Sequence, residues 1–454
     1  MSSPHVLVFP FMAKGHAIPL LQLTRFLLRH SATVTLVTTP GNRPFICHCL
    51  SDTTATIIDI PFPQDVQGIP PGVESTDKLP DISLWLDLAT ATKLMQPHFE
   101  QMLESLPPIS FMITDFFLSW TLDSANKFSI PRLPFYPMGI FAFLLPRLVS
   151  QKRFFKEDEG IKIVDFPWIR LKKEDFDPVF IDPEGVKGTR AYDFTLEAVK
   201  ATSKSYGIVV NSFYELESVF SDFWNTNIGP PVWCFGPLPL AEPPKIKQAN
   251  YQTPWWISWL DHMHEEGKSV LYVAFGTQAE ISPTQFREIQ TGLEESGVNF
   301  VWVVRNNGTQ IEEVFEERVR NRGIVVREWV DQREILEHES VRGFLCHCGW
   351  SSLMEGICAK VPILALPLMW EQPLNAKLVV EVAGIGLRVE RDDGLAKAAK
   401  ELMEGKAGEE VRKKVEKIGS AAARAVKEGG SSWKALNRLI SELHGAHCIL
   451  DTKI

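Results

Sequence analysis

Several features that mark large classes of proteins are scarce or missing in this sequence. The 454 residues include seven cysteines, an odd number scattered from Cys47 to Cys448, which is not the framework of a small disulfide-stabilised secreted domain. Long blocks of lysine or arginine are missing, and 56 acidic against 47 basic residues give a formal net charge of -9. Nucleic acid is therefore not expected as a partner.

Membrane and export signals are missing as well. The longest apolar stretch, from Leu133 to Pro146, is interrupted by proline and is shorter than the roughly 20 residues that a membrane span needs. The N-terminal residues lack the basic region and the small-residue cleavage site of a signal peptide. We expect a cytoplasmic protein with no integral membrane segment.

The common nucleotide and metal motifs are also missing or incomplete. No G-x-G-x-x-G follows the first predicted strand and no G-x-x-x-x-G-K-[ST] occurs, so hydride transfer and ATP chemistry lose their main support. The Cys-His-Cys runs at 47–49 and 346–348 do not complete a four-ligand zinc spacing, because residues two apart on a strand share a face in only one pair each. The Asp-Phe-Asp run at 175–177 lies among charged residues and is interpreted as a solvated run. We expect no metal and no cofactor.

The pattern that is present is an alternation of short strands and helices. With 45% hydrophobic and 23% charged residues the chain should fold, and its length fits two or three domains. This rhythm predicts parallel α/β sheets in two similar halves. The predicted strands are 5–10, 33–39, 56–63, 110–115, 269–276, 300–304, 323–328, 343–347 and 361–367. We divide the chain into domains at 1–240 and 255–454 with a proline-rich linker at 241–254, and expect a closing helix that could pack back on the first half.

Ligands of open α/β sheets bind outside the carboxyl ends of the strands, so the residues at those ends are the candidates for a site. They are the loop up to His16, Asp115, Gly276, Thr277, Trp329 and the turn at 347–352.

The segment from Trp329 to Gln372 combines a Trp, a Gln, a His-Cys-Gly-Trp turn, a Glu and a final acid-Gln pair in a fixed order. It resembles the signature box of plant family-one UDP-sugar glycosyltransferases. The resemblance implies an α/β fold of the GT-B class, in which two Rossmann-like domains have parallel sheets facing a central cleft. It also implies that the N-terminal domain binds the acceptor and the C-terminal domain the UDP-sugar.

Physical chemistry places an anion at the 347–352 turn, because the start of a helix offers unpaired backbone N–H groups. The resemblance assigns His347 to the β-phosphate, and Ser351 and Ser352 to the α-phosphate. A capping box from Ser352 to Glu355 is the alternative interpretation.

Trp329 could offer a flat face to uracil, although a buried core Trp is the alternative for a chain with 13 tryptophans. In the resemblance, Gln332 and Glu355 bind the ribose hydroxyls, and Trp350, Glu371 and Gln372 read the sugar. Gln372 is similar to the glucose-preferring choice of the family. Thr277 and Val330 complete the implied donor set.

Three residues depart from the family's usual pattern. Ser351 replaces Asn, Glu371 replaces Asp, and Lys360 replaces a Gly before Val-Pro. The stretch at 386–394 is also shorter than usual. The loss of the amide at 351 should weaken phosphate binding without abolishing it.

A base is needed to take the proton of an acceptor hydroxyl, and histidine titrates in the right range. His16, in the loop after the first strand, is the candidate, with Asp115 to orient it. A surface loop histidine and a helix N-cap are the alternatives. An aromatic acceptor pocket is expected from a set of side chains in the first half, most of which belong to the core: Trp85, Phe116, Phe117, Trp120 and Phe141.

The sequence thus favours an inverting, monomeric glycosyltransferase that moves glucose from UDP-glucose to a hydroxyl of a small plant phenolic such as a flavonoid. Transfer to an aromatic ring carbon is an alternative within the same class. A catalytically weak UDP-sugar-binding protein is the alternative from another class, suggested by the three departures from the family pattern.

Overall fold

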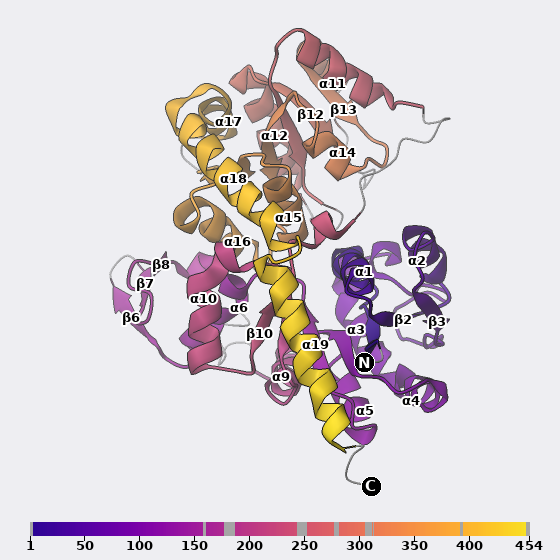
Figure 1. Cartoon of the computed structure of the whole chain (residues 1–454). Coiled ribbons are helices and arrows are strands. Elements are labelled where there is room, and N and C mark those ends of the chain that lie inside the picture. Colours follow the sequence, from indigo (N-terminus) through magenta and orange to yellow (C-terminus); the bar gives the residue numbers. More distant parts are fainter. Residues whose placement is uncertain are drawn as a thin grey trace. The chain divides into compact units, whose positions relative to one another are not determined.

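The computed structural model describes residues 3–157, 160–176, 187–242, 252–276, 281–304, 311, 313–390 and 394–450 (Figure 1). The chain packs into two compact units. The first unit comprises residues 1–153, 178–242 and 424–454, and the second comprises 154–177 and 243–423. Most of the predicted linker, residues 243–251, lies outside the described residues.

The first unit contains a seven-stranded parallel sheet in the order β10-β9-β5-β4-β1-β2-β3. Its strands are β1 (His5–Phe9), β2 (Thr33–Thr38), β3 (Thr56–Asp59), β4 (Phe111–Asp115), β5 (Arg132–Tyr136), β9 (Ile208–Val210) and β10 (Val232–Cys234). The central strands β1 and β4 are almost entirely buried, as expected for a parallel sheet covered on both faces.

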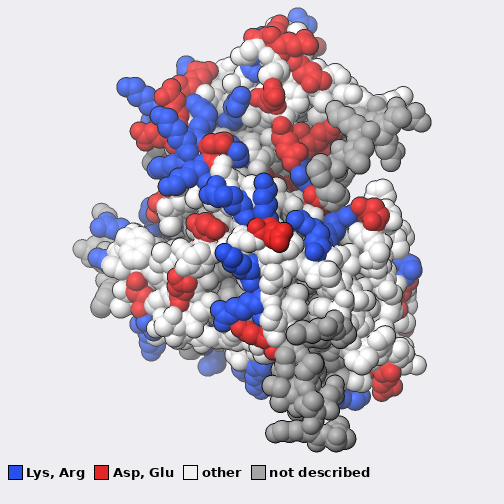
Figure 2. Space-filling model, viewed as in Figure 1, with Lys and Arg blue, Asp and Glu red and all other residues white. Residues whose placement is uncertain are grey.

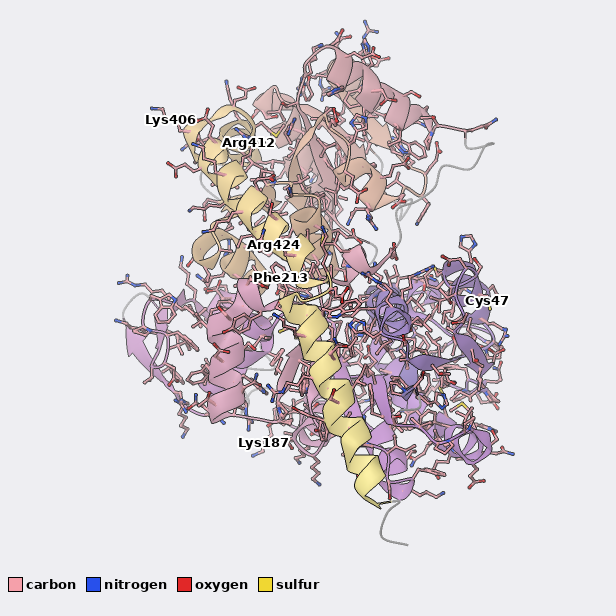
Figure 3. All side chains as sticks on the ribbon, viewed as in Figure 1. Cys47, Lys187, Phe213, Lys406, Arg412 and Arg424 are labelled. Atoms are coloured by element: carbon pink, nitrogen blue, oxygen red, sulfur yellow. The ribbon has the colours of Figure 1, made fainter. Side chains whose placement is uncertain are left out.

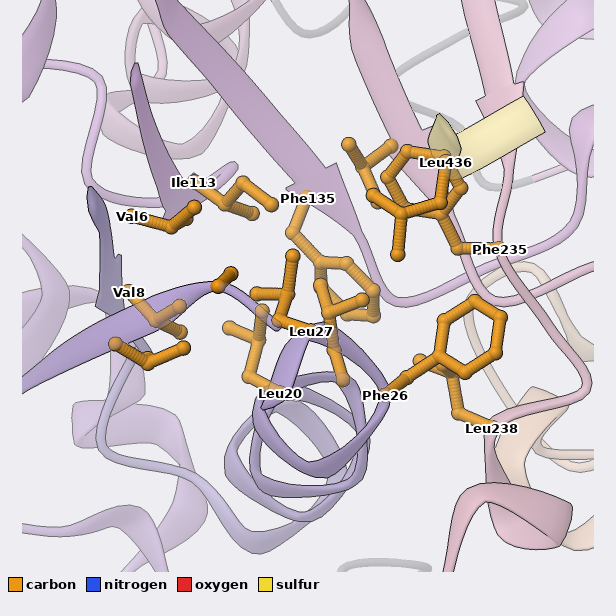
Figure 4. Close-up of a cluster of buried hydrophobic side chains, with 14 of the residues drawn as sticks. Val6, Val8, Leu20, Phe26, Leu27, Ile113, Phe135, Phe235, Leu238 and Leu436 are labelled. Atoms are coloured by element: carbon orange, nitrogen blue, oxygen red, sulfur yellow. The ribbon is translucent and has the colours of Figure 1, made fainter. Parts of the chain in front are cut away.

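Helices cover both faces of this sheet and form two apolar cores. They are α1 (Lys14–Arg29), α2 (Arg43–Cys49), α3 (Trp85–Ala91), α4 (Gln96–Ser105), α5 (Thr121–Lys127), α6 (Ile140–Ser150), α9 (Arg190–Ser203), α10 (Tyr214–Asn227) and α19 (Ser431–Leu450), with short 3-10 turns at η1 (Thr76–Lys78), η2 (Ile82–Leu84), η3 (Thr92–Met95) and η5 (Leu238–Ala241). One core joins the sheet to α1 and to Leu436 of α19 (Figure 4). The described part of the chain therefore ends in a helix that belongs to the first unit.

The second unit has a six-stranded parallel sheet in the order β13-β12-β11-β14-β15-β16. Its strands are β11 (Val270–Ala274), β12 (Asn299–Val303), β13 (Gly323–Val326), β14 (Val341–Cys346), β15 (Ile363–Ala365) and β16 (Gly386–Arg388). The surrounding helices are α11 (Trp255–Glu265), α12 (Pro283–Ser296), α13 (Glu313–Val319), α14 (Gln332–Leu336), α15 (Trp350–Cys358), α16 (Gln372–Lys377), the π-helix η6 (Leu378–Val382), α17 (Gly394–Glu404) and α18 (Lys406–Ala425).

Helix α18 is strongly amphipathic. Val411, Val415 and Ala422 are buried, and lysine and arginine side chains gather over α17 and α18 in Figure 2. Lys406 and Arg412, labelled in Figure 3, mark the course of this helix. The negative net charge of the protein is therefore unevenly distributed.

A small antiparallel sheet belongs to a different unit from the one predicted for its residues. It consists of β6 (Phe154–Glu157), β7 (Gly160–Ile163) and β8 (Arg170–Leu171), continues into the 3-10 turn η4 (Lys173–Asp175), and belongs to the second unit although it lies within the predicted first domain. The reason is Asp175, which lies 3.6 Å from the Lys377 ammonium and 4.0 Å from the Arg388 guanidinium.

The interpretation of 175–177 as a solvated run is wrong for Asp175, which is only 4% exposed and accepts the backbone N–H of Lys172 at 2.7 Å. Two basic partners in the folded chain offset the cost of burying this carboxylate. Asp177 lies outside the described residues. The other apparent metal motif in this half of the chain, at 47–49, lies on helix α2 and not on a strand.

The contact between α1 and α19 contains a titratable group. The His30 ring lies 3.8 Å from the ring of Trp433, its Nδ1 bonds the Phe26 carbonyl at 2.8 Å, and its Nε2 is buried with no partner among the described residues. Burial lowers the pKa of His30. The folded protein therefore binds this proton less readily than the unfolded chain, whose histidines titrate near pH 6.5.

We expect the free energy of unfolding to fall as the pH drops below about 6.5, because protonation of His30 then favours the unfolded state. Urea titrations at pH 7 and pH 5.5 measure this difference. His30→Gln should reduce it, and the same change at the exposed His48 should not. Equal pH dependence in both variants would contradict this assignment.

Candidate functional site

In each parallel sheet the strands that follow the first one in the chain are added on one side of it, and later strands are added on its other side. In the first unit β1 lies between β2 and β4, and in the second unit β11 lies between β12 and β14. At such a switch point the loops leaving neighbouring strands diverge to opposite faces and open a place for a ligand. His16 follows β1, and Asp115 is the last residue of β4. In the second unit Gly276 follows β11 and His347 follows β14. These four residues therefore lie at the switch points of the two sheets, whereas Trp329 follows the outer strand β13.

In the first unit, a histidine and a carboxylate meet. His16 Nδ1 lies 2.9 Å from Oδ2 of Asp115, whose side chain is fully buried, whereas 18% of the His16 side chain is exposed. The second carboxylate oxygen accepts the backbone N–H of Phe117 at 2.9 Å. Both Asp115 oxygens are thus occupied, and His16 Nε2 has no partner among the described residues. A neutral ring held in this way leaves its Nε2 lone pair free to accept a proton.

The local structure differs from the sequence-based picture at both residues. His16 does not lie in a loop but in the first turn of α1, three residues after the N-cap Ala13. Asp115 does not cap α5, because Trp120 is the N-cap of that helix. The helix fixes the backbone of His16, and Asp115 fixes the Nδ1 edge of its ring.

Aromatic side chains surround His16. Its ring centroid lies 4.9 Å from that of Phe117 and 5.5 Å from that of Phe11, and Trp85 stacks on Phe117 at 5.5 Å. Phe194 also meets Phe117, at 5.4 Å. Phe11 and Phe194 were missing from the predicted set because no local pattern distinguishes them from other buried phenylalanines.

The other predicted aromatics are farther from the histidine. Phe116 contacts Phe117 at 5.8 Å and is largely buried. Trp120 is 4% exposed and donates its indole N–H to a threonine, and Phe141 is fully buried against Phe220. Trp120 and Phe141 therefore belong to the core.

In the second unit, β14 leads through a three-residue turn into α15, whose N-cap is Gly349. The first intrahelical bond is made by the N–H of Leu353 to the Gly349 carbonyl, so the preceding N–H groups have no acceptor in the helix. The Ser351 hydroxyl has no partner among the described residues. The turn therefore has the donors of an anion site.

The capping-box interpretation of Ser352 is wrong, since Ser352 is the third residue of the helix and its N-cap makes no side-chain bond. The Ser352 hydroxyl instead accepts a hydrogen bond from Gln332 at 3.3 Å.

His347 fills the space above this turn. Burial lowers its pKa to about 4, so the ring is neutral at pH 7, and its Nδ1 is buried with no partner among the described residues. A Cβ built on Gly276 would lie 2.8 Å from the ring, and one on Gly349 would lie 2.5 Å from it. Both glycines are needed because the ring packs directly on their Cα atoms.

Gln332 connects the two elements that the resemblance assigns to the ribose. Its Nε2 donates to the Glu355 carboxylate and its Oε1 accepts from the Tyr272 hydroxyl at 3.1 Å. Tyr272 was not among the predicted site residues, because it lies in an apolar strand whose pattern is typical of a buried core. Trp329 is 76% exposed, which contradicts the buried-core alternative, and Val330 beside it is half-buried.

The acid-Gln pair lies at the start of α16. Gln372 is 4% exposed, and its Oε1 accepts the N–H groups of Leu368 and Met369, both at 3.0 Å, so only its NH₂ is available to a ligand. Glu371 is the half-buried N-cap of α16. Trp350 is 2% exposed, and Thr277 lies outside the described residues.

The departure at residue 360 has a structural explanation. Lys360 has φ +60°, the left-handed region in which a non-glycine residue costs about 1 to 2 kcal/mol, so a glycine suits this turn. Its ammonium pairs with Glu416 at 2.6 Å and its side chain covers Gly419. Lys360 therefore acts in packing against α18. Of the short 386–394 stretch, residues 391–393 lie outside the described residues.

The described residues contain neither a candidate membrane span nor a cluster of metal-ligating side chains. None of the helices in those ranges is both long and apolar enough to cross a membrane. Within the same ranges, no three histidine, cysteine or acidic side chains cluster as metal ligands would.

Two units that each hold a parallel sheet covered by helices have the architecture of the GT-B glycosyltransferases. Residues 257–418 match the model of the family described as UDP-glucoronosyl and UDP-glucosyl transferase. UDP-glycosyltransferase 90A1 of Arabidopsis thaliana is 50% identical over 97% of this chain and 96% of its own. UDP-glucose flavonoid 3-O-glucosyltransferase 7 of Fragaria ananassa is 34% identical over 97% and 96%.

A solved structure shows the same likeness in three dimensions. Phytolacca americana UGT2, complexed with UDP-2fluoro-glucose and pterostilbene, superposes with a TM-score of 0.80 at 26% identity, covering 97% of this chain and 100% of that one. The chain belongs to the plant family-one UDP-glycosyltransferases. It is an enzyme that transfers a glycosyl group from a UDP-sugar, and the expected GT-B fold is confirmed.

Trp329→Ala should weaken UDP binding by about 5-fold to 150-fold, because a stacking face worth about 1 to 3 kcal/mol is lost. Calorimetric titration with UDP measures this. Trp168→Ala removes another exposed tryptophan of the same unit, 60% exposed, and should leave UDP affinity unchanged. An unaltered affinity in the Trp329 variant would refute its role in nucleotide binding.

Proposed function

We propose that the enzyme transfers glucose from UDP-glucose to a hydroxyl of a small phenolic such as a flavonoid, with inversion at the anomeric carbon. The observation that carries this proposal is the 2.9 Å bond between His16 and the fully buried Asp115. An intact base and orienting acid also argue against a protein that only binds UDP-sugars. A ring held by Nδ1 on a carboxylate is arranged to accept a proton at Nε2.

In the proposed reaction, His16 Nε2 takes the proton of the acceptor hydroxyl while that oxygen attacks the anomeric carbon. The bond from the anomeric carbon to the diphosphate oxygen breaks, and its electron pair leaves with UDP. Asp115 stabilises the imidazolium that forms. One displacement from the face opposite the leaving group inverts the anomeric centre.

The second unit supplies the donor site in this proposal. The open N–H groups at the start of α15, the Ser351 hydroxyl and the neutral His347 ring would hold the diphosphate and stabilise the charge that develops on it. Trp329 would stack on uracil, Gln332 and Glu355 would bind the ribose, and Glu371 and the Gln372 NH₂ would bind the glucose. No step requires a metal.

The aromatic acceptor is supported by the side chains around His16. Phe11, Phe117 and Trp85 give flat apolar faces beside the proposed base. The strawberry relative is named for a flavonoid hydroxyl, and pterostilbene lies in the Phytolacca complex. We also propose that the enzyme acts as a monomer in the cytosol. None of the six cysteines whose side chains the structure describes forms a disulfide, which supports a reducing compartment.

The donor assignment predicts that UDP-glucose is used in preference to UDP-galactose and UDP-glucuronate, because the glucose site offers hydrogen-bonding groups and no cation for a carboxylate. Competition with a phenolic panel, with products identified by mass spectrometry, measures this preference, and the same assays with EDTA test metal independence. Preferred use of UDP-glucuronate would rule out the assignment. Products that survive hot acid would show transfer to ring carbon.

Replacement of the proposed base gives the sharpest test of mechanism. His16→Ala should reduce turnover on a hydroxyl acceptor by about 100-fold to 10,000-fold, the usual share of general base catalysis, with UDP affinity retained. Asp115→Asn should cost less, and the double variant should be far from additive, because the two residues act as a unit. Near-normal turnover of His16→Ala on a weakly acidic alcohol would show that another group is the base.

A further inference from the structure

One buried side chain joins the phosphate turn to the sugar end of the proposed donor site. Asn375 lies in α16 and is 1% exposed. Its Nδ2 donates to the backbone carbonyl of Cys348, in the turn before α15, at 3.0 Å, and to Oε1 of Glu371 at 3.3 Å. Among the described residues, no other side-chain amide bonds both the turn before α15 and Glu371.

The orientation of this amide follows from its partners. A carbonyl and a carboxylate both accept hydrogen bonds, so the NH₂ group must face them. Asn375 Oδ1 is then buried with no partner among the described residues. The asparagine thus supplies a donor to the Cys348 carbonyl and to the Glu371 carboxylate, although its own Oδ1 stays unpaired.

Backbone strain lies on both sides of this bridge. Cys348 has φ +64° and Trp370 has φ +53°, and neither is glycine. Such conformations persist only where surrounding bonds hold them, and they gather at functional sites. The bond to the Cys348 carbonyl fixes the peptide plane between Cys348 and Gly349, and therefore sets the direction of the Gly349 N–H at the N-cap of α15.

We propose that Asn375 is a positioning residue that couples glucose recognition by Glu371 to diphosphate recognition by the 347–352 turn. This inference rests on the proposed function. With Asn375 in place, the Glu371 carboxylate and the Cys348 carbonyl of the phosphate turn are bonded to the same amide group. The glucose share of donor affinity then depends on a residue that does not touch the donor.

The far end of α16 is anchored independently of this bridge. The Lys377 ammonium lies 3.6 Å from the buried Asp175 and 2.7 Å from Glu381. Replacing Asn375 therefore leaves the helix attached at its C-terminal end, and a change in donor affinity can be separated from unfolding.

The test is Asn375→Leu, which keeps a similar shape and removes both the bridge and the unpaired oxygen. Titration calorimetry without acceptor gives the Kd for UDP-glucose and for UDP. We expect the UDP-glucose affinity to fall about 10-fold and the UDP affinity to fall less than about 3-fold, with the variant still folded at the temperature of the titration although its Tm is lowered. Asn211→Leu is the matched control, since Asn211 is a 1% exposed asparagine of the first unit that accepts the Leu238 N–H at 2.8 Å. That variant should lower the Tm and leave both affinities unchanged.

A second pair of variants tests the route through Glu371. If Asn375 acts by holding Glu371, Asn375→Leu should cost little further UDP-glucose affinity in a Glu371→Ala background. An unchanged UDP-glucose affinity in Asn375→Leu, an equal loss for UDP and UDP-glucose, or full additivity with Glu371→Ala would each overturn the proposal. Donor binding with no transfer by the wild type would instead overturn the proposed function and leave the result for Asn375 standing.

Discussion

The carboxyl ends of parallel strands lie at the same end of a sheet. The His–Asp pair of the first unit and the His347 turn of the second unit both depend on this constraint. His16 and Asp115 are 99 residues apart in the chain, yet β1 and β4 pair directly and bring them to 2.9 Å. The same relation between β11 and β14 places Gly276 under the ring of His347. Because neighbouring strands run in one direction, each crossover helix begins at this edge, and helix N-termini and strand ends meet there.

The proposed donor site in the second unit would bind a diphosphate on a protein of negative net charge. The formal net charge is -9, and the histidine nearest the anion-binding turn is neutral because burial lowers its pKa to about 4. In the proposed site the attraction would come from backbone N–H groups, hydroxyls and the helix dipole, whose directions are set by the fold.

Strained backbone and close glycine contacts gather around the same turn. Cys348 and Trp370 have left-handed conformations, and His347 packs on two glycines that no other residue could replace without a clash. Lys360 has the same conformation farther along, where its side chain reaches Glu416 and covers Gly419. The first two residues flank groups assigned to the donor, whereas the third contributes to the packing of α18. Left-handed residues in this unit therefore lie both beside the proposed donor site and in a packing contact with α18.

Local signals in the sequence were sufficient for nine of the thirteen strands in the two parallel sheets, for the α/β rhythm of two halves and for the residues at several strand ends. Strands β5, β9, β10 and β16 were not predicted. Alternation and turn chemistry are local properties, and the segment from Trp329 to Gln372 carries its resemblance in linear order. Contacts between distant residues were not available from such signals. The exposure of Trp329, the burial of Asp175 beside Lys377, the loss of Trp120 and Phe141 to the core, and the bridge made by Asn375 were all decided by tertiary packing. A side chain's role depends on which partners it meets, and only the folded chain determines those partners.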